Sequence, residues 1–185
     1  MISEKRQIDN FNRVANERVS WALCGHSLIT SSQILFSEYD KVDLDKLNTG
    51  DPLPPAGTIF DVVKMLRAMA LECYLKALWV KSGGTLATDG KYITIPGTSN
   101  HDLLTLIDSL SDKVDLAISI EDLHLLKRLS LSISGGRYPI QRTWKSGKMQ
   151  KLPNGGEGPL SCWTFPADED LFASLVARIQ QNLEA

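Results

Sequence analysis

Residues 58–84, TIFDVVKMLRAMALECYLKALWVKSGG, constrain the fold more than any other part of this sequence. Apolar residues recur there with the spacing of an α-helix, and further apolar side chains flank that stripe. A helix that is apolar nearly all round has to be covered by other elements. We therefore expect this segment to be the buried central helix of a mainly helical domain. Thr58 and Asp61 predict a capping box at its start, and Gly83 and Gly84 predict its end.

Four other segments have helical patterns, which gives about five helices in one domain over residues 1–185. The first is expected over residues 4–36, and Gly25 in its interior predicts close approach of another backbone, from a core helix or a second subunit. A small β-hairpin is expected around Asp89 and Gly90. The remaining helices are expected from about 101, over 120–133 and over 167–183.

Composition limits the classes of function. The net charge of −2 gives no global field towards nucleic acid, so any such attraction has to be local. No run reaches the roughly 18 apolar residues of a membrane span, and the N-terminus lacks the apolar stretch of a signal peptide. We expect a cytoplasmic protein that does not contact the membrane. Its cysteines, Cys24, Cys73 and Cys162, are expected to be reduced and have no metal-ligand spacing, so we expect neither a metal nor a cofactor.

Residues 137–151, here called the basic segment, carry five cations and two aromatic residues but no acid. This composition is typical of sites where phosphate charge is neutralised and bases stack. A solvated loop or a protein-binding surface would also explain it. The candidate ligand-binding residues are Arg137, Tyr138, Arg142, Trp144, Lys145 and Lys148.

The three histidines are scattered along the chain. The segment SNHDL at 99–103 has the composition of a helix start, and the helix dipole would keep His101 neutral and able to accept a proton. His26 is expected in the core or in an interface. His124 is expected on a solvated polar face that it shares with Arg128.

Three pieces of the sequence, in this order, resemble the HEPN family of helical domains. They are the helix LRAMALECYLKALWVKSGG, the segment HDLLTL and the turn RYP, and the resemblance covers about residues 58–140. It implies an up-and-down helical bundle that is often a homodimer. Members include metal-independent endoribonucleases, partners of nucleotidyltransferases in toxin–antitoxin pairs, and non-catalytic RNA-binding forms. The positions that match the family are the polar pair Glu72 and Lys76, the helix start His101 and Asp102, and the turn Arg137, Tyr138 and Pro139.

One departure from the family bears on activity. Ribonucleases of this family carry an arginine followed four to six residues later by a histidine. Here Arg142 follows Arg137 at five residues, and no histidine occurs after His124. Because an arginine neither gives nor takes a proton readily near pH 7, the usual nuclease centre is absent.

Three hypotheses follow. The first is a non-catalytic HEPN-like homodimer that binds RNA or nucleotide phosphate through the basic segment, in a toxin–antitoxin or defence system. The second is a divergent metal-independent endoribonuclease that uses His101 and Arg137. The third is an interaction subunit of a nucleotidyltransferase partner.

Overall fold

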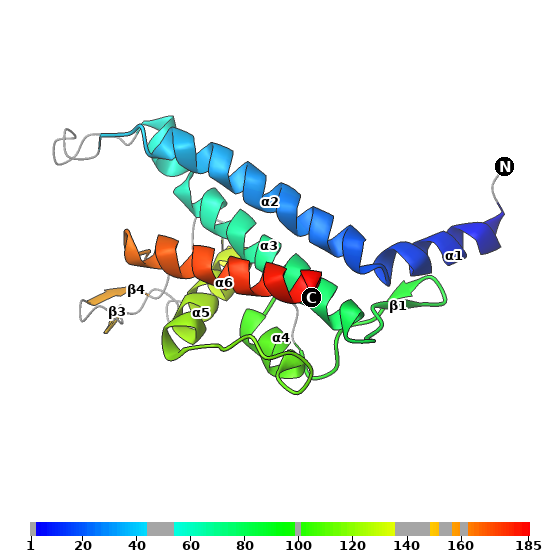
Figure 1. The fold of residues 1–185 in the computed structure, drawn as a ribbon. Coiled ribbons are helices and arrows are strands. Elements are labelled where there is room, and N and C mark those ends of the chain that lie inside the picture. Colours follow the sequence, from blue (N-terminus) through cyan, green and yellow to red (C-terminus); the bar gives the residue numbers. More distant parts are fainter. Residues whose placement is uncertain (1–2, 44–53, 99–100, 136–148, 152–156, 160–162) are drawn as a thin grey trace.

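The computed structural model describes residues 3–43, 54–98, 101–135, 149–151, 157–159 and 163–185, and it confirms a mainly helical bundle with a small β-hairpin (Figure 1). The described residues form six α-helices, one 3-10 helix and two antiparallel strand pairs. In chain order these are α1 (Glu4–Ala15), α2 (Arg18–Tyr39), η2 (Pro55–Thr58), α3 (Phe60–Lys81), β1 (Ala87–Thr88), β2 (Lys91–Tyr92), α4 (Leu103–Leu110), α5 (Ile120–Gly135), β3 (Met149–Lys151), β4 (Glu157–Pro159) and α6 (Ala167–Glu184). In the two strand pairs, Ala87 faces Tyr92 and Met149 faces Pro159.

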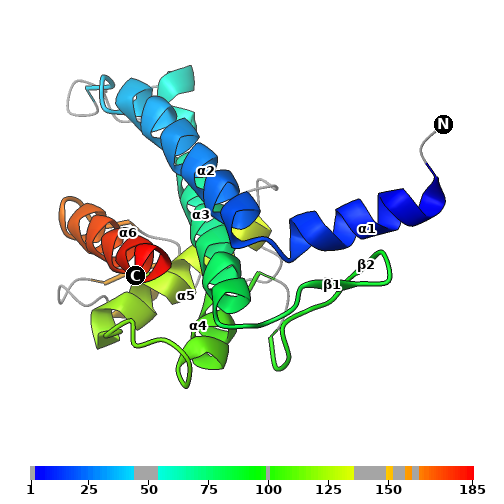
Figure 2. The same cartoon turned by 45° about the vertical axis from the view of Figure 1, so that its right-hand side comes forward.

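Helix α3 is the central helix, as its sequence predicts. It packs against α2, α4, α5 and α6 (Figures 1 and 2). Gly83 ends it with a positive φ of 84°, and the N–H of Gly84 donates to the carbonyl of Trp79 at 2.9 Å. Thr58 was expected at the N-cap, but Ile59 takes that position. The helix begins after η2 without a side-chain cap, and Asp61 pairs with Lys64 at 2.6 Å.

The predicted first helix is two helices, because the chain breaks between α1 and α2. The side chain of Asn16 accepts hydrogen bonds from the backbone N–H groups of Leu86 and Ala87 and donates one to the carbonyl of Ala87. These contacts tie the break to the β1–β2 hairpin. Helix α1 therefore projects from the bundle alongside that hairpin (Figure 2).

Helix α2 packs closely on α3 around Gly25. A Cβ atom at Gly25 would lie 2.9 Å from the ring of Tyr74 and 3.2 Å from the carbonyl oxygen of Ala70. The expected close approach is therefore confirmed, and the neighbouring backbone is that of the core helix α3. The residue has to be glycine because the space for a side chain is filled.

One hydrophobic cluster joins the helices. Its fully buried leucines come mostly from α3, α4 and α5, and Ile179 is among the residues that α6 adds. Because α3 packs against α2, α4, α5 and α6, its polar side chains Lys64, Arg67 and Glu72 are buried. Among the helices of the described residues, none is both long and apolar enough to cross a membrane.

Candidate functional site

The described residues leave the predicted phosphate-binding surface untested. Arg137, Tyr138, Arg142, Trp144, Lys145 and Lys148 all lie outside them. The structure does describe the other residues that the HEPN resemblance singles out, which are Glu72, Lys76, His101 and Asp102.

Glu72, Lys76 and His101 meet in one group, here called the His101 cluster. One carboxylate oxygen of Glu72, Oε1, accepts a hydrogen bond from Nζ of Lys76 at 2.6 Å. The other, Oε2, lies 2.8 Å from Nδ1 of His101. The predicted i, i+4 pair on α3 is thus present, and the chain brings His101 to it from 29 residues away.

The electrostatics of the cluster keep Glu72 and Lys76 charged. Burial favours a raised pKa for Glu72, but the hydrogen bonds from His101 and Lys76 outweigh burial and hold the pKa below 4.5. Burial also favours a lowered pKa for Lys76, and the contact with Glu72 reverses this, so the pKa lies above 10.5. Because a carboxylate only accepts hydrogen bonds, the Nδ1 atom of His101 carries the hydrogen. In the neutral ring Nε2 is then an acceptor.

The backbone around His101 is fixed by the start of α4. Asp102 caps this helix, and its side chain accepts from the N–H of Leu104 at 3.0 Å. The N–H of Leu103 donates to Oγ of Ser130 on α5, also at 3.0 Å. His101 itself has a φ of +68°, which is uncommon for a residue with a side chain. Its side chain is 44% exposed, so the ring contacts Glu72 on one edge and remains accessible to solvent.

Two aromatic rings enclose Lys76. Its Nζ atom lies 4.9 Å from the ring centroid of Trp21 on α2 and 5.3 Å from that of Tyr92 on β2. Sequence reasoning missed both rings, because they come from segments far from α3 in the chain and have no local signal. These contacts hold Lys76 in place, and its charge is already compensated by Glu72.

Helix α5, which precedes the basic segment in the chain, contacts the start of α4. Ser130, which binds the start of α4, is five residues before Gly135, where α5 ends. Five residues of helix rise about 7.5 Å. Helix α5 therefore ends about 7.5 Å, less than two helical turns, beyond Ser130.

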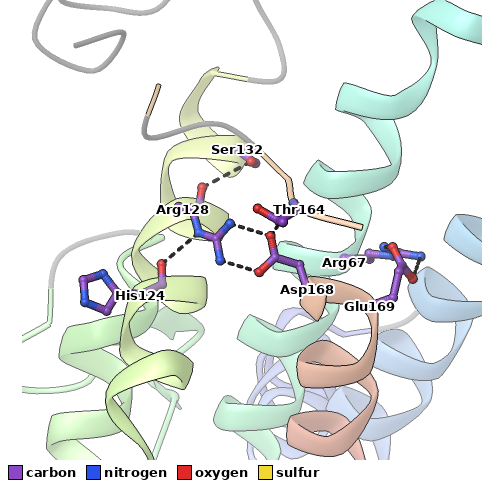
Figure 3. A network of polar contacts seen from close by, with 7 residues as sticks. All are labelled: Arg67, His124, Arg128, Ser132, Thr164, Asp168 and Glu169. Carbon is purple, nitrogen blue, oxygen red and sulfur yellow. Dashed lines mark hydrogen bonds and ion pairs between the residues drawn. The ribbon is translucent and has the colours of Figure 1, made fainter. Parts of the chain in front are cut away.

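A second polar network lies between α5 and α6 (Figure 3). Arg128 and Asp168 form two hydrogen bonds of 2.5 Å, and they are 4% and 5% exposed. The backbone N–H of Thr164 adds a hydrogen bond to Asp168 at 2.6 Å. Arg128 was expected on a solvated face with His124, and this is wrong for Arg128: only His124 is exposed. The reason is the carboxylate that α6 presents to α5.

Beside it, Arg67 of α3 pairs with Glu169 at 2.5 and 2.9 Å (Figure 3). The guanidinium of Arg67 also lies against the rings of Phe36, Trp163 and Phe172, at 5.0 to 5.2 Å from their centroids. Glu169 lies in the first turn of α6, so this pair joins α6 to α3. These contacts hold elements together and offer no exposed titratable group.

Across the part of the chain that the structure describes, no group of three or more histidine, cysteine or acidic side chains is placed to hold a metal ion. No family model matches the chain, and neither the curated proteins nor the solved structures gave a significant match. Membership of the HEPN family therefore stays a prediction from the sequence.

Proposed function

We propose that this protein is a HEPN-like module that binds RNA at the His101 cluster with the help of the basic segment. The observation that carries the proposal is the 2.8 Å contact between Glu72 and His101. It joins two of the positions that the sequence resemblance selects, although they are distant in the chain. It also leaves an accessible ring edge on His101, which a purely structural ion pair does not require.

The chemistry of this ring edge favours RNA as the ligand. A neutral His101 with its hydrogen on Nδ1 presents an acceptor at Nε2, and the ribose 2′-hydroxyl is a donor that DNA lacks. Binding RNA also requires cations that neutralise its phosphate groups. Lys76 is engaged by Glu72, and the basic segment offers five cations without an acid. We therefore assign sugar recognition to His101 and phosphate neutralisation to the basic segment.

The test is the affinity for a single-stranded RNA over a range of salt concentrations, with the same sequence in DNA as the control ligand. Arg137→Ala/Arg142→Ala should weaken binding and reduce the salt slope by about 1.4, because two phosphate contacts are lost. His101→Ala should remove the preference for RNA over DNA and leave the slope unchanged. No RNA binding, or a slope unchanged in the double variant, would exclude the proposal.

A second candidate function rests on the same contact. A histidine that a carboxylate orients can take a proton from the 2′-hydroxyl, as metal-independent RNA cleavage requires. Arg137 would stabilise the charge on phosphorus in that reaction. This candidate predicts RNA cleavage in the presence of a chelator, and the loss of cleavage in His101→Ala. RNA that stays intact with the purified wild type would leave binding as the function.

We also propose that the module is a homodimer, as the resemblance implies. Helix α1 has no buried residue, and Phe11, Val19 and Leu23 are among the exposed apolar side chains of α1 and α2. Light scattering should give twice the chain mass of 20.5 kDa. A mass of 20.5 kDa would contradict the dimer. Co-purification with a nucleotidyltransferase from the native host would favour the partner-subunit hypothesis and a toxin–antitoxin or defence role.

A further inference from the structure

Two free cysteines face each other across the α2–α3 interface. The Sγ atoms of Cys24 and Cys73 are 3.6 Å apart, although the residues are 49 positions apart in the chain. Cys24 is exposed and Cys73 is buried. A disulfide bond is about 2.05 Å long, so the two sulfur atoms are about 1.5 Å too far apart for a bond. Forming the bond requires the two side chains to rotate towards each other.

The packing next to the cysteines supports this geometry. Gly25 follows Cys24 and packs on Tyr74, which follows Cys73. A Cβ atom at Gly25 would lie 3.2 Å from the carbonyl oxygen of Ala70. The backbones of α2 and α3 are therefore close at the level of the two sulfur atoms, as a disulfide between helices requires.

We infer that Cys24 and Cys73 form a site of reversible oxidation, where a peroxide converts the two thiols into a disulfide between α2 and α3. The sulfur of Cys24 attacks one peroxide oxygen and the O–O bond breaks. Water or an alcohol leaves, and Cys24 becomes a sulfenic acid. The sulfur of Cys73 then attacks that of Cys24, the S–O bond breaks, and the hydroxyl group leaves as water with the proton of Cys73. Each peroxide is reduced by two electrons, and the thiol pair supplies both.

The environments of the two sulfur atoms determine which cysteine reacts with the peroxide first. Burial, and then the neighbouring Cys24, raise the pKa of Cys73 to about 12. Cys73 therefore stays a thiol and is shielded from an oxidant in solution. Cys24 meets the oxidant because it is exposed. The second step is intramolecular, and its two sulfur atoms are already in contact.

The disulfide would lie directly beside the His101 cluster. Cys73 is next to Glu72 in the chain, and Cys24 lies one helical turn after Trp21, whose ring covers Lys76. Among its described residues, α2 buries only Gly25, Ile29 and Ser32. A covalent bond to α3 would therefore fix a helix that is otherwise held along a narrow stripe. This inference does not depend on RNA binding, because the bond can be measured directly.

The experiment treats the purified protein with hydrogen peroxide and then measures its mass, its disulfide map and its Tm. We expect the mass of one chain less two hydrogen atoms, with one bond between Cys24 and Cys73 of the same chain that dithiothreitol reverses. The cross-link should raise the Tm by on the order of 10 °C. RNA affinity of the oxidised protein is a separate readout and leaves the assignment of the bond unaffected.

Two variants distinguish this bond from others. Cys162→Ser should form the same bond as the wild type, whereas Cys24→Ser should form no intramolecular bond. Cys24 is exposed, so its replacement leaves the core intact. The inference is overturned by a chain that stays reduced, by Cys24 ending as a sulfinic acid, by a Cys24–Cys24 dimer, or by a bond to Cys162.

Discussion

Glu72 and Asp168 are both nearly buried carboxylates, at 7% and 5% exposure, and each binds nitrogen donors from side chains. Their partners differ. Asp168 receives both side-chain hydrogen bonds from the guanidinium of Arg128, which is buried as well. Glu72 divides its two oxygens between Lys76 and His101, and the side chain of His101 is 44% exposed.

This difference separates a structural ion pair from a candidate functional site. Both members of the Arg128–Asp168 pair are shielded from solvent. The ring of His101 has one edge that is accessible to solvent. The carboxylate of Glu72 orients that ring. The Arg128–Asp168 pair joins α5 to α6, while the His101 cluster leaves one ring edge open to solvent.

Breaking the buried pair should have the largest effect on stability. Asp168→Ala leaves the charge of Arg128 buried without its carboxylate, so we expect a loss of about 3–5 kcal/mol in the free energy of unfolding. Urea denaturation measures this loss. Asp170→Ala removes an exposed acid from the same helical turn and should cost at most about 0.5 kcal/mol. Equal losses in the two variants would show that the Arg128–Asp168 pair does not hold α5 to α6.

Glu72→Gln should cost less, about 2 kcal/mol, because hydrogen bonds to a charged group are lost but an amide still fills the space. The same denaturation experiment measures it, with the exposed Glu121→Gln as the matched control. Affinity for RNA should also fall, because His101 loses the group that orients it. A variant as stable as the wild type would mean that water replaces the hydrogen bonds that Glu72 makes to Lys76 and His101 at no net cost.

The stability that Glu72 contributes should depend on pH in a defined direction. Its pKa in the folded protein lies below the ordinary value of 4.5, so its contribution is present above pH 4.5 and is lost as the pH falls through the lower, folded pKa. Glutamine does not titrate. The difference between wild type and Glu72→Gln should therefore shrink below pH 4.5 in urea titrations at successive pH values. A difference that stays constant from pH 7 into acid would contradict the lowered pKa.

His101→Ala should have the smallest effect on stability, below about 1 kcal/mol, because the lost hydrogen bond is partly exposed to solvent. The same variant should lose the preference for RNA over DNA entirely. Urea denaturation and binding to matched RNA and DNA measure the two effects on the same preparation. A large loss of stability with an unchanged RNA preference would place His101 with the structural residues.

The sequence predicts what depends on local spacing. The central helix follows from its apolar pattern, and the Glu72–Lys76 pair from the spacing of four residues. Arg128 and Asp168 are 40 residues apart, and no local pattern indicates that they meet. The break after α1 could not be predicted for the same reason, because Asn16 binds a hairpin about 70 residues away. His101 was singled out by a resemblance to short motifs, and its contact with Glu72 required the fold.

The central claim is that the His101 cluster and the basic segment bind the same RNA molecule. A double-mutant cycle on RNA Kd tests it most directly, with His101→Ala, Arg137→Ala/Arg142→Ala and their combination. If both regions contact one RNA, each change should weaken binding on its own, and the combined variant should bind more weakly than either, by about the sum of the separate losses. A combined variant that binds no more weakly than one of the separate variants, or a His101→Ala variant with the wild-type Kd, would contradict a single shared surface.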